Sequence, residues 1–100
     1  MAINQKPIAP SSATVGITSA TALAANGAAA NLVLTNDSDT DFYLAWGTHA
    51  AVLNKGVLLA SGASLIITAN DERINFDLQA IASAASKNMA IQVFEHSYNQ

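Results

Sequence analysis

The chain has 100 residues, enough for one hydrophobic core but not for a second domain of useful size. Its net charge is −3 and its four basic residues are scattered, so it has no basic stretch that could bind a nucleic-acid backbone. The absence of cysteine excludes disulfides, thiol catalysis and thiolate metal ligands.

The surface of this protein is expected to be poor in charge. Charged residues make up 11% of the chain, against about 25% in an average soluble protein. Such a surface favours packing against other subunits, and we expect a homo-oligomer, with a trimer as the first choice. A monomer is the alternative, because alanine raises the hydrophobic fraction without creating a sticky patch.

The N-terminal residues 1–13 are predicted to form an extended arm, and residues 14–100 a single β-domain. Pro7, Pro10 and the pair Ser11-Ser12 interrupt any regular alternation in the arm. They also interrupt the apolar stretch that a signal peptide would need, and no later segment approaches the ~20 apolar residues of a membrane helix. We therefore expect neither a signal peptide nor a membrane anchor.

From residue 14 onward the chain reads as about seven short β-like runs separated by turn residues. Thr14–Leu23 is followed by Asn26-Gly27, a dipeptide that favours a tight hairpin. Its predicted partner strand is Ala29–Thr35, in which alternate side chains face opposite sides of the sheet. The turn-rich residues after this strand end it.

The clearest alternation lies in Asp41–Trp46, where Phe42, Leu44 and Trp46 share one face. Aromatic side chains at this point could stack on a sugar or a base. Because Trp46 shares its face with two apolar residues, we predict instead that it belongs to the core.

Three further runs complete the predicted sheet. Val57–Ala60 and Ala63–Ala69 are expected to pair as a hairpin around Ser61-Gly62. Leu78–Ser86 fits both a helical face and a strand, and we assign it to a strand, followed by the strand Met89–Glu95. The sequence thus predicts an all-β fold, a small antiparallel β-sandwich or jelly roll with an extended N-terminal arm.

Three aspartates at alternate positions, Asp37, Asp39 and Asp41, resemble the start of a calcium-binding loop. A loop of the EF-hand type needs glycine at its sixth position and an acidic residue at its twelfth, where this chain has Phe42 and Thr48. We expect a solvated turn here and predict no metal, although the pattern alone leaves open whether these aspartates bind a cation.

No other group of residues predicts catalysis or cofactor binding. His49 and His96 have no second ligand at metal-type spacing, and we interpret both as surface or interface residues. Gly62-Ala63-Ser64 is not completed to a nucleophile elbow, and no glycine-rich phosphate loop is present. We therefore predict a protein that is not an enzyme and has no cofactor.

Several runs of this sequence resemble a pattern found in small all-β virion proteins of tailed bacteriophages, of the capsid decoration or cement type. The runs are Asn31–Asp39, Tyr43–Gly47, Gly56–Ser64 and Leu78–Ala84, and the resemblance extends over about Asn31 to Phe94. It implies a small β-sandwich or jelly-roll domain that serves as a head decoration subunit, a fibre base or a tail accessory. It brings no catalytic residues, and Asn70–Phe76 departs from the usual pattern, which leaves the place in the virion open.

The function expected from these observations is that of a structural virion protein. We expect a capsid decoration or cement subunit that is made in the host bacterial cytoplasm, binds the major capsid protein on the outer surface of the head and stabilises it. The alternative is a binding module at a fibre base or in a tail. A small hydrolase is a third class that no polar constellation supports, and neither nucleic acid nor a membrane is an expected partner.

The arm is expected to make the capsid contact. Its apolar residues Ile3 and Ile8 would be buried against the shell, and Lys6 would meet an acidic residue there. Pro7 and Pro10 restrict the unbound arm, which lowers the entropy lost on docking.

Overall fold

The computed structural model describes residues 3–25, 29–68 and 76–98, with backbone only for residues 3–5 and 96–98. The described residues form β-strands joined by turns, with no helix and therefore no helix able to cross a membrane. This confirms the predicted all-β class. The strands are β1 (Ile3–Pro7), β2 (Ser11–Val15), β3 (Ala20–Leu23), β4 (Ala29–Asn36), β5 (Phe42–Trp46), β6 (Val57–Leu59), β7 (Ser64–Thr68), β8 (Leu78–Ala82) and β9 (Lys87–Tyr98).

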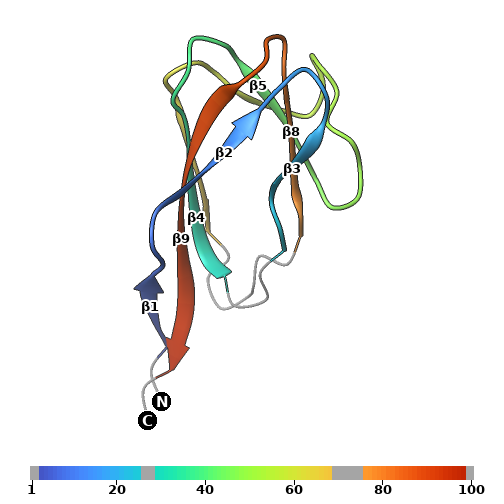
Figure 1. Cartoon of the computed structure of the whole chain (residues 1–100). Helices are drawn as coiled ribbons and strands as arrows, with labels where there is room; N and C mark the ends of the chain where they lie inside the picture. Colours follow the sequence, from blue (N-terminus) through green and yellow to red (C-terminus); the bar gives the residue numbers. More distant parts are fainter. Residues whose placement is uncertain (1–2, 26–28, 69–75, 99–100) are drawn as a thin grey trace.

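The strands form two antiparallel sheets that pack face to face as a β-sandwich (Figure 1). The larger sheet has the order β1-β9-β4-β7, with β2 on the same edge of β9 as β1, and the smaller has the order β3-β8-β5-β6. From β2 onward nearly every connection crosses from one sheet to the other, which is the arrangement of a jelly roll. Only β5 and β6 are both consecutive and paired in the described part of the chain.

The hairpin predicted from Thr14–Leu23 and Ala29–Thr35 is wrong. The first segment breaks after Val15 into β2 in the larger sheet and β3 in the smaller one, and β3 pairs with β8. β4 pairs with β7 and β9 instead. A turn signal predicts that the chain reverses, but not whether the next strand joins the same sheet. The dipeptide Asn26-Gly27 lies outside the described residues.

The hairpin predicted around Ser61-Gly62 is also wrong, because β6 belongs to the smaller sheet and β7 to the larger one. The turn itself exists: Gly62 has a φ of 76° and donates its N–H to the main-chain oxygen of Asn36. The ambiguous segment Leu78–Ser86 contains strand β8, as predicted, because its pairing with β3 and β5 outweighs the local helical pattern.

The N-terminal arm is extended, as predicted, but it is paired along much of its length. β1 and the end of β9 run together beyond the body of the sandwich as a ribbon (Figure 1). The boundary expected after Ala13 falls inside β2, whose last residue, Val15, is 2% exposed in the core. The ribbon makes the molecule elongated, with extents of 47 × 23 × 16 Å.

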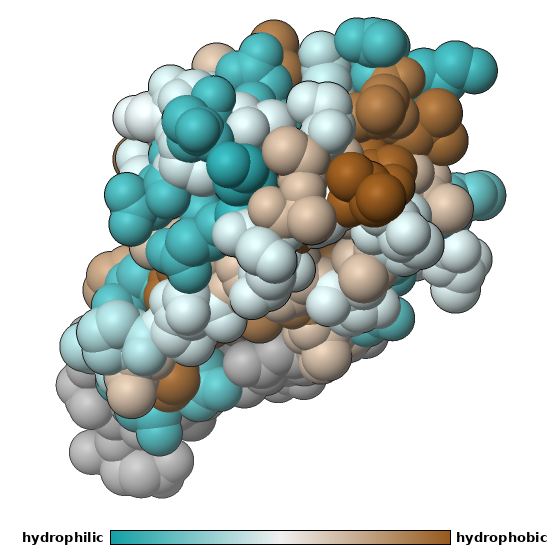
Figure 2. Space-filling view, turned by 45° about the horizontal axis from the view of Figure 1, so that its top comes forward, coloured by the Kyte–Doolittle hydropathy of each residue, from teal (hydrophilic) through white to brown (hydrophobic). Residues whose placement is uncertain are grey.

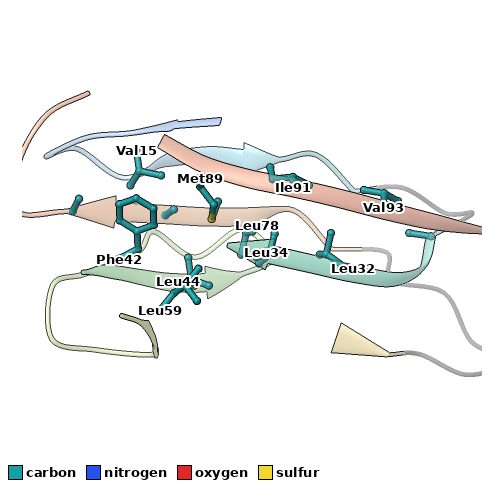
Figure 3. Packing of buried hydrophobic residues seen from close by; sticks show 13 residues of the cluster. Val15, Leu32, Leu34, Phe42, Leu44, Leu59, Leu78, Met89, Ile91 and Val93 are labelled. Atoms are coloured by element: carbon teal, nitrogen blue, oxygen red, sulfur yellow. The ribbon is translucent and has the colours of Figure 1, made fainter. Parts of the chain in front are cut away.

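The core fills the space between the two sheets with one aromatic residue and many aliphatic ones (Figure 3). Phe42 and Leu44 from the smaller sheet face Leu34, Met89 and Ile91 from the larger one. Trp46 lies on the same face as Phe42 but is only half-buried, because it stands at the end of β5. The predicted core position of Trp46 is thus correct, although it lies at the edge of the core.

Candidate interaction surface

The outward face of the larger sheet carries no charged side chain among the described residues. Outward positions alternate along each strand with the buried ones, and strand register aligns them across the sheet. They are Ser12, Thr14, Asn31, Val33, Thr35, Ser64, Ile66, Thr68, Asn88, Ala90, Gln92 and Phe94. This face is therefore made of small polar and apolar groups only.

The outward face of the smaller sheet is likewise uncharged in the described part of the chain. Its outward positions are Thr21, Tyr43, Ala45, Leu58, Gln79 and Ile81. The charged residues that the structure describes lie in loops, at the start of β9 or on the β1–β9 ribbon, where Lys6 stands opposite Glu95. Among the described residues, the charges therefore lie off the two flat faces of the sandwich, which are both neutral.

An apolar patch lies on the loop after β5 and on β6, and we define it as Val52, Leu53, Val57 and Leu58. Between 37% and 52% of each of these side chains is exposed. Figure 2 shows strongly apolar side chains gathered at one corner of the surface. Composition alone did not reveal this patch, because the strand pairing decides which of these residues are left uncovered.

The predicted capsid-contact residues lie along one edge of the larger sheet, and the side chain of Ile3 is outside the described part. Lys6, Pro7 and Pro10 are exposed, so their side chains are free to meet a partner. Ile8 is half-buried against the core, and its N–H donates to Val93 O at 2.9 Å. Ile8 is therefore held mainly by contacts within its own chain, and only its exposed part could contact a partner.

Pro10 also lines a shallow groove of about 160 Å³ on the larger sheet, together with Ser11, Val33, Thr35, Ala90, Ile91 and Gln92. Gln92 spans the edge of this groove, because its Nε2 donates to the main-chain oxygen of Ile8. The groove is too shallow to enclose a small molecule, but an apolar side chain of a partner would fit it.

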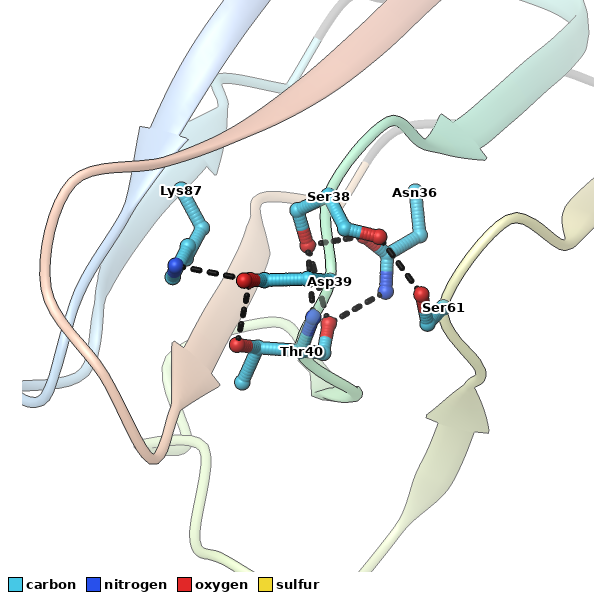
Figure 4. Close-up of polar contacts among 6 residues, drawn as sticks. All are labelled: Asn36, Ser38, Asp39, Thr40, Ser61 and Lys87. Carbon is cyan, nitrogen blue, oxygen red and sulfur yellow. Dashed lines mark hydrogen bonds and ion pairs between the residues drawn. The ribbon is translucent and has the colours of Figure 1, made fainter.

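The three aspartates surround a turn organised by Asn36, which is fully buried (Figure 4). Its Nδ2 donates to the main-chain oxygens of Thr40 and Leu59, at 2.8 and 2.9 Å, and its Oδ1 accepts from Ser38 Oγ at 2.6 Å. All these groups belong to the protein itself. The amide therefore holds the turn in place without a ligand.

The aspartates of this turn do not converge on one point. Asp39 accepts from Lys87 Nζ at 2.7 Å, and Asp41 accepts from the N–H of Ser61 at 2.9 Å. No group of three histidine, cysteine or acidic side chains able to hold a metal occurs in the described parts of the chain. The hydrogen bond from Lys87 is the main cause that lowers the pKa of Asp39, followed by the one from Thr40 Oγ1.

A larger hollow of about 360 Å³ lies beside this turn and is lined by Asp39, Thr40, Asp41, Tyr43, Leu53, Asn54 and Ser83. Two side-chain hydrogen bonds join described residues of this lining: Tyr43 Oη donates to Asn54 Oδ1 at 3.1 Å, and Thr40 Oγ1 donates to Asp39 Oδ1 at 2.9 Å. Because Asp39 Oδ1 also accepts from Lys87 Nζ and the pKa of Asp39 is lowered, this carboxylate is a weak base for the Thr40 hydroxyl beside it. His49 is exposed in the loop after β5, and the side chain of His96 is outside the described part.

The fold is that of a small jelly-roll domain in which an additional N-terminal strand, β1, joins the larger sheet. A solved structure described as "Bacillus endospore appendages form a novel family of disulfide-linked pili" is similar, with a TM-score of 0.56 and 15% sequence identity. The match covers 97% of this chain and 89% of the other. At this identity the likeness shows the fold alone. No protein-family model and no curated protein matches the sequence.

Proposed function

We propose that the protein is a non-enzymatic structural subunit that works through its surface within a large assembly, as a decoration or cement subunit on the head of a tailed phage. The observation that carries the proposal is that both outward faces of the sandwich lack charge among the described residues. The interiors of protein interfaces are depleted of charge, because burying an unpaired charge is costly. Neutral faces on a domain whose described charges lie elsewhere are suited to lateral contacts.

The β1–β9 ribbon is the proposed anchor on the major capsid protein. It projects beyond the sandwich, and Lys6 and Pro7 are exposed along it. A paired ribbon is already ordered, so docking it costs less conformational entropy than docking a free arm. The apolar patch is a second candidate contact, because its four side chains are already exposed at one end of the molecule.

The test is to measure the copy number of the protein in purified particles and its binding to undecorated heads. A decoration subunit is expected at a copy number close to that of the major capsid protein, whereas a fibre-base or tail accessory module would be present in only a few copies. Deleting residues 1–7 should weaken head binding, and the full chain with Thr21→Ala serves as the control for an exposed residue on another edge. Absence of the protein from the head would contradict the proposal.

A second candidate function is that of a subunit in a self-assembling filament. It is favoured by the likeness to the appendage protein, which extends over 97% of this chain. Because this sequence has no cysteine, such a filament would be held by non-covalent contacts and not by disulfides. Electron microscopy of the purified protein alone distinguishes the two, because a filament subunit polymerises without heads and a decoration subunit does not.

A further inference from the structure

The two sheets have four edges in total, and each edge presents unpaired main-chain groups to which another strand could add. Proteins usually protect such edges with proline, charge, a bulge or a very short strand. The edge of the larger sheet formed by β1 and β2 has these protections: Lys6, Pro7 and Pro10 lie along it, and the two strands are interrupted between Pro7 and Ser11. A continuous partner strand could not pair along this edge.

Both edges of the smaller sheet are protected as well. β3 has only four residues, and its pairing with β8 shifts register between Thr21 and Leu23, as at a bulge. β6 has only three residues and follows Lys55 and Gly56, the latter with a φ of 79°. Neither strand offers a long regular edge.

β7 at the other edge of the larger sheet has none of these protections. It pairs with β4 without a register shift and contains neither charge nor proline in Ser64–Thr68. No other described strand pairs with it. At its centre the side chain of Ile66 is 66% exposed, the most exposed large apolar side chain among those described.

The main-chain groups on the free side of β7 follow from the alternation of an antiparallel ladder. Asn36 donates its N–H to Ala63 O at 2.9 Å, and these two residues continue the β4–β7 register as a hydrogen-bonded pair. Every second residue then bonds to β4, which assigns Leu65 and Ile67 to that side. The N–H and C=O groups of Ser64, Ile66 and Thr68 are directed to the open edge.

We propose that β7 pairs antiparallel with β7 of a second copy, about a twofold axis at Ile66. This contact goes beyond the proposed function and does not depend on it. In this register Ile66 lies opposite Ile66 of the other copy, and Ser64 lies opposite Thr68, so every pair on the outward face is uncharged. When the edge of a β-strand pairs antiparallel with the same edge of a second copy, the N–H groups of each strand meet the C=O groups of the other. The three protected edges lack a regular run of such groups long enough for this pairing. The pairing would also join two neutral outward faces into one continuous sheet surface.

A second copy is electrostatically compatible with this edge, although like charges oppose self-association in general. Each chain has a net charge of −3, so two copies repel each other unless the contact keeps their charges apart. The described charges lie in loops, at the start of β9 and on the ribbon, and the outward residues of β4 that stand opposite β7 are Asn31, Val33 and Thr35. Pairing through β7 therefore brings no described charged side chain into the contact.

The test uses the full chain and measures its mass in solution by sedimentation over a range of concentrations. The wild type is expected to be a dimer, and Ile66→Lys is expected to weaken association at least about tenfold, because two like charges would stand opposite each other. Ile66 is exposed, so the variant should keep its fold, which circular dichroism would verify. The matched control, Thr21→Lys, adds the same charge to an exposed residue of edge strand β3 and should leave the dimer intact.

A charge-pairing experiment tests whether residue 66 of one copy lies opposite residue 66 of the other. Ile66→Lys and Ile66→Glu should each be monomeric, and an equal mixture should recover dimers that contain one copy of each. A wild type that is monomeric or trimeric at all concentrations would overturn the proposal, as would an Ile66→Lys variant that dimerises like the wild type. If Ile66→Lys still binds heads, the proposed function stands even where the dimer does not.

Discussion

Asn36 at the end of β4 donates from its Nδ2 to the main-chain oxygen of Leu59 at the end of β6, so one fully buried amide joins the two sheets. The same Nδ2 donates to Thr40 O, and the Oδ1 accepts from Ser38 Oγ (Figure 4). This residue therefore fixes where the acidic turn lies relative to both sheets.

Replacing Asn36 by alanine should lower the free energy of unfolding by about 1–3 kcal/mol, because buried main-chain oxygens would lose their donor. Urea unfolding at neutral pH measures the change. Asn88→Ala is the control: this asparagine is exposed on β9, and the change should stay within about 0.5 kcal/mol. Equal effects of the two substitutions would show that the amide does not organise the turn.

Gly56→Ala should be strongly destabilising, because an added Cβ would lie 2.5 Å from Leu44 O and the residue has a φ of 79°. The clash is with the main chain of β5, which cannot move without disturbing the core. We expect a loss above about 2 kcal/mol, of which the positive φ alone accounts for about 1 kcal/mol. Gly47→Ala separates the two causes, because Gly47 has a similar φ of 80° but no atom within 4 Å of the added Cβ. Thermal unfolding of both variants checks the prediction, and similar losses would argue against the clash.

The ion pair between Asp39 and Lys87 should give a small pH-dependent contribution to stability. The pKa of Asp39 is lowered in the folded state by Lys87 and Thr40. The contribution of the pair to stability is therefore fully present above the pKa that Asp39 has in the unfolded chain. It is lost as the pH falls through the lowered pKa of the folded protein, in the range below about pH 4. The difference in stability between wild type and Asp39→Asn should therefore be present at pH 7 and disappear in acid.

The contribution of this pair should also decrease with salt, because the Asp39 side chain is 78% exposed and exposed pairs are screened. Urea unfolding of the two proteins at several pH values and two salt concentrations tests both statements. A difference that grows toward low pH would contradict the assigned direction of the pKa change.

Deleting residues 1–7 should leave the sandwich folded, whereas deleting residues 1–13 should not. β1 pairs with β9 alone, but the longer deletion removes Ser11, Ser12 and Ala13 from β2 and also Ile8, which packs against the core. Circular dichroism and thermal unfolding of the two truncated chains test this. If the longer deletion unfolds as cooperatively as the full chain, the N-terminal strands do not belong to the domain.

The sequence by itself determined the class of fold and much of the core. Alternation in Phe42–Trp46 and in the last strand predicted β-structure correctly, because the period of side chains along a strand is a local property of the backbone. It also determined that charge is scarce and cysteine absent. The spacing of Asp37, Asp39 and Asp41 did not show that Asp39 bonds to Lys87 and Asp41 to the N–H of Ser61, because both partners come from distant parts of the chain.

Only the tertiary structure decided which strands pair and which residues are left exposed. Both predicted hairpins were wrong, since successive strands such as β3 and β4, or β6 and β7, belong to opposite sheets, and a turn dipeptide has the same local signal in either case. The free edge of β7, the exposure of Ile66 and the role of Asn36 all depend on partners far away in the sequence. A strand carries the same main-chain groups in the middle of a sheet as at its edge, so local sequence does not tell which strand lacks a neighbour.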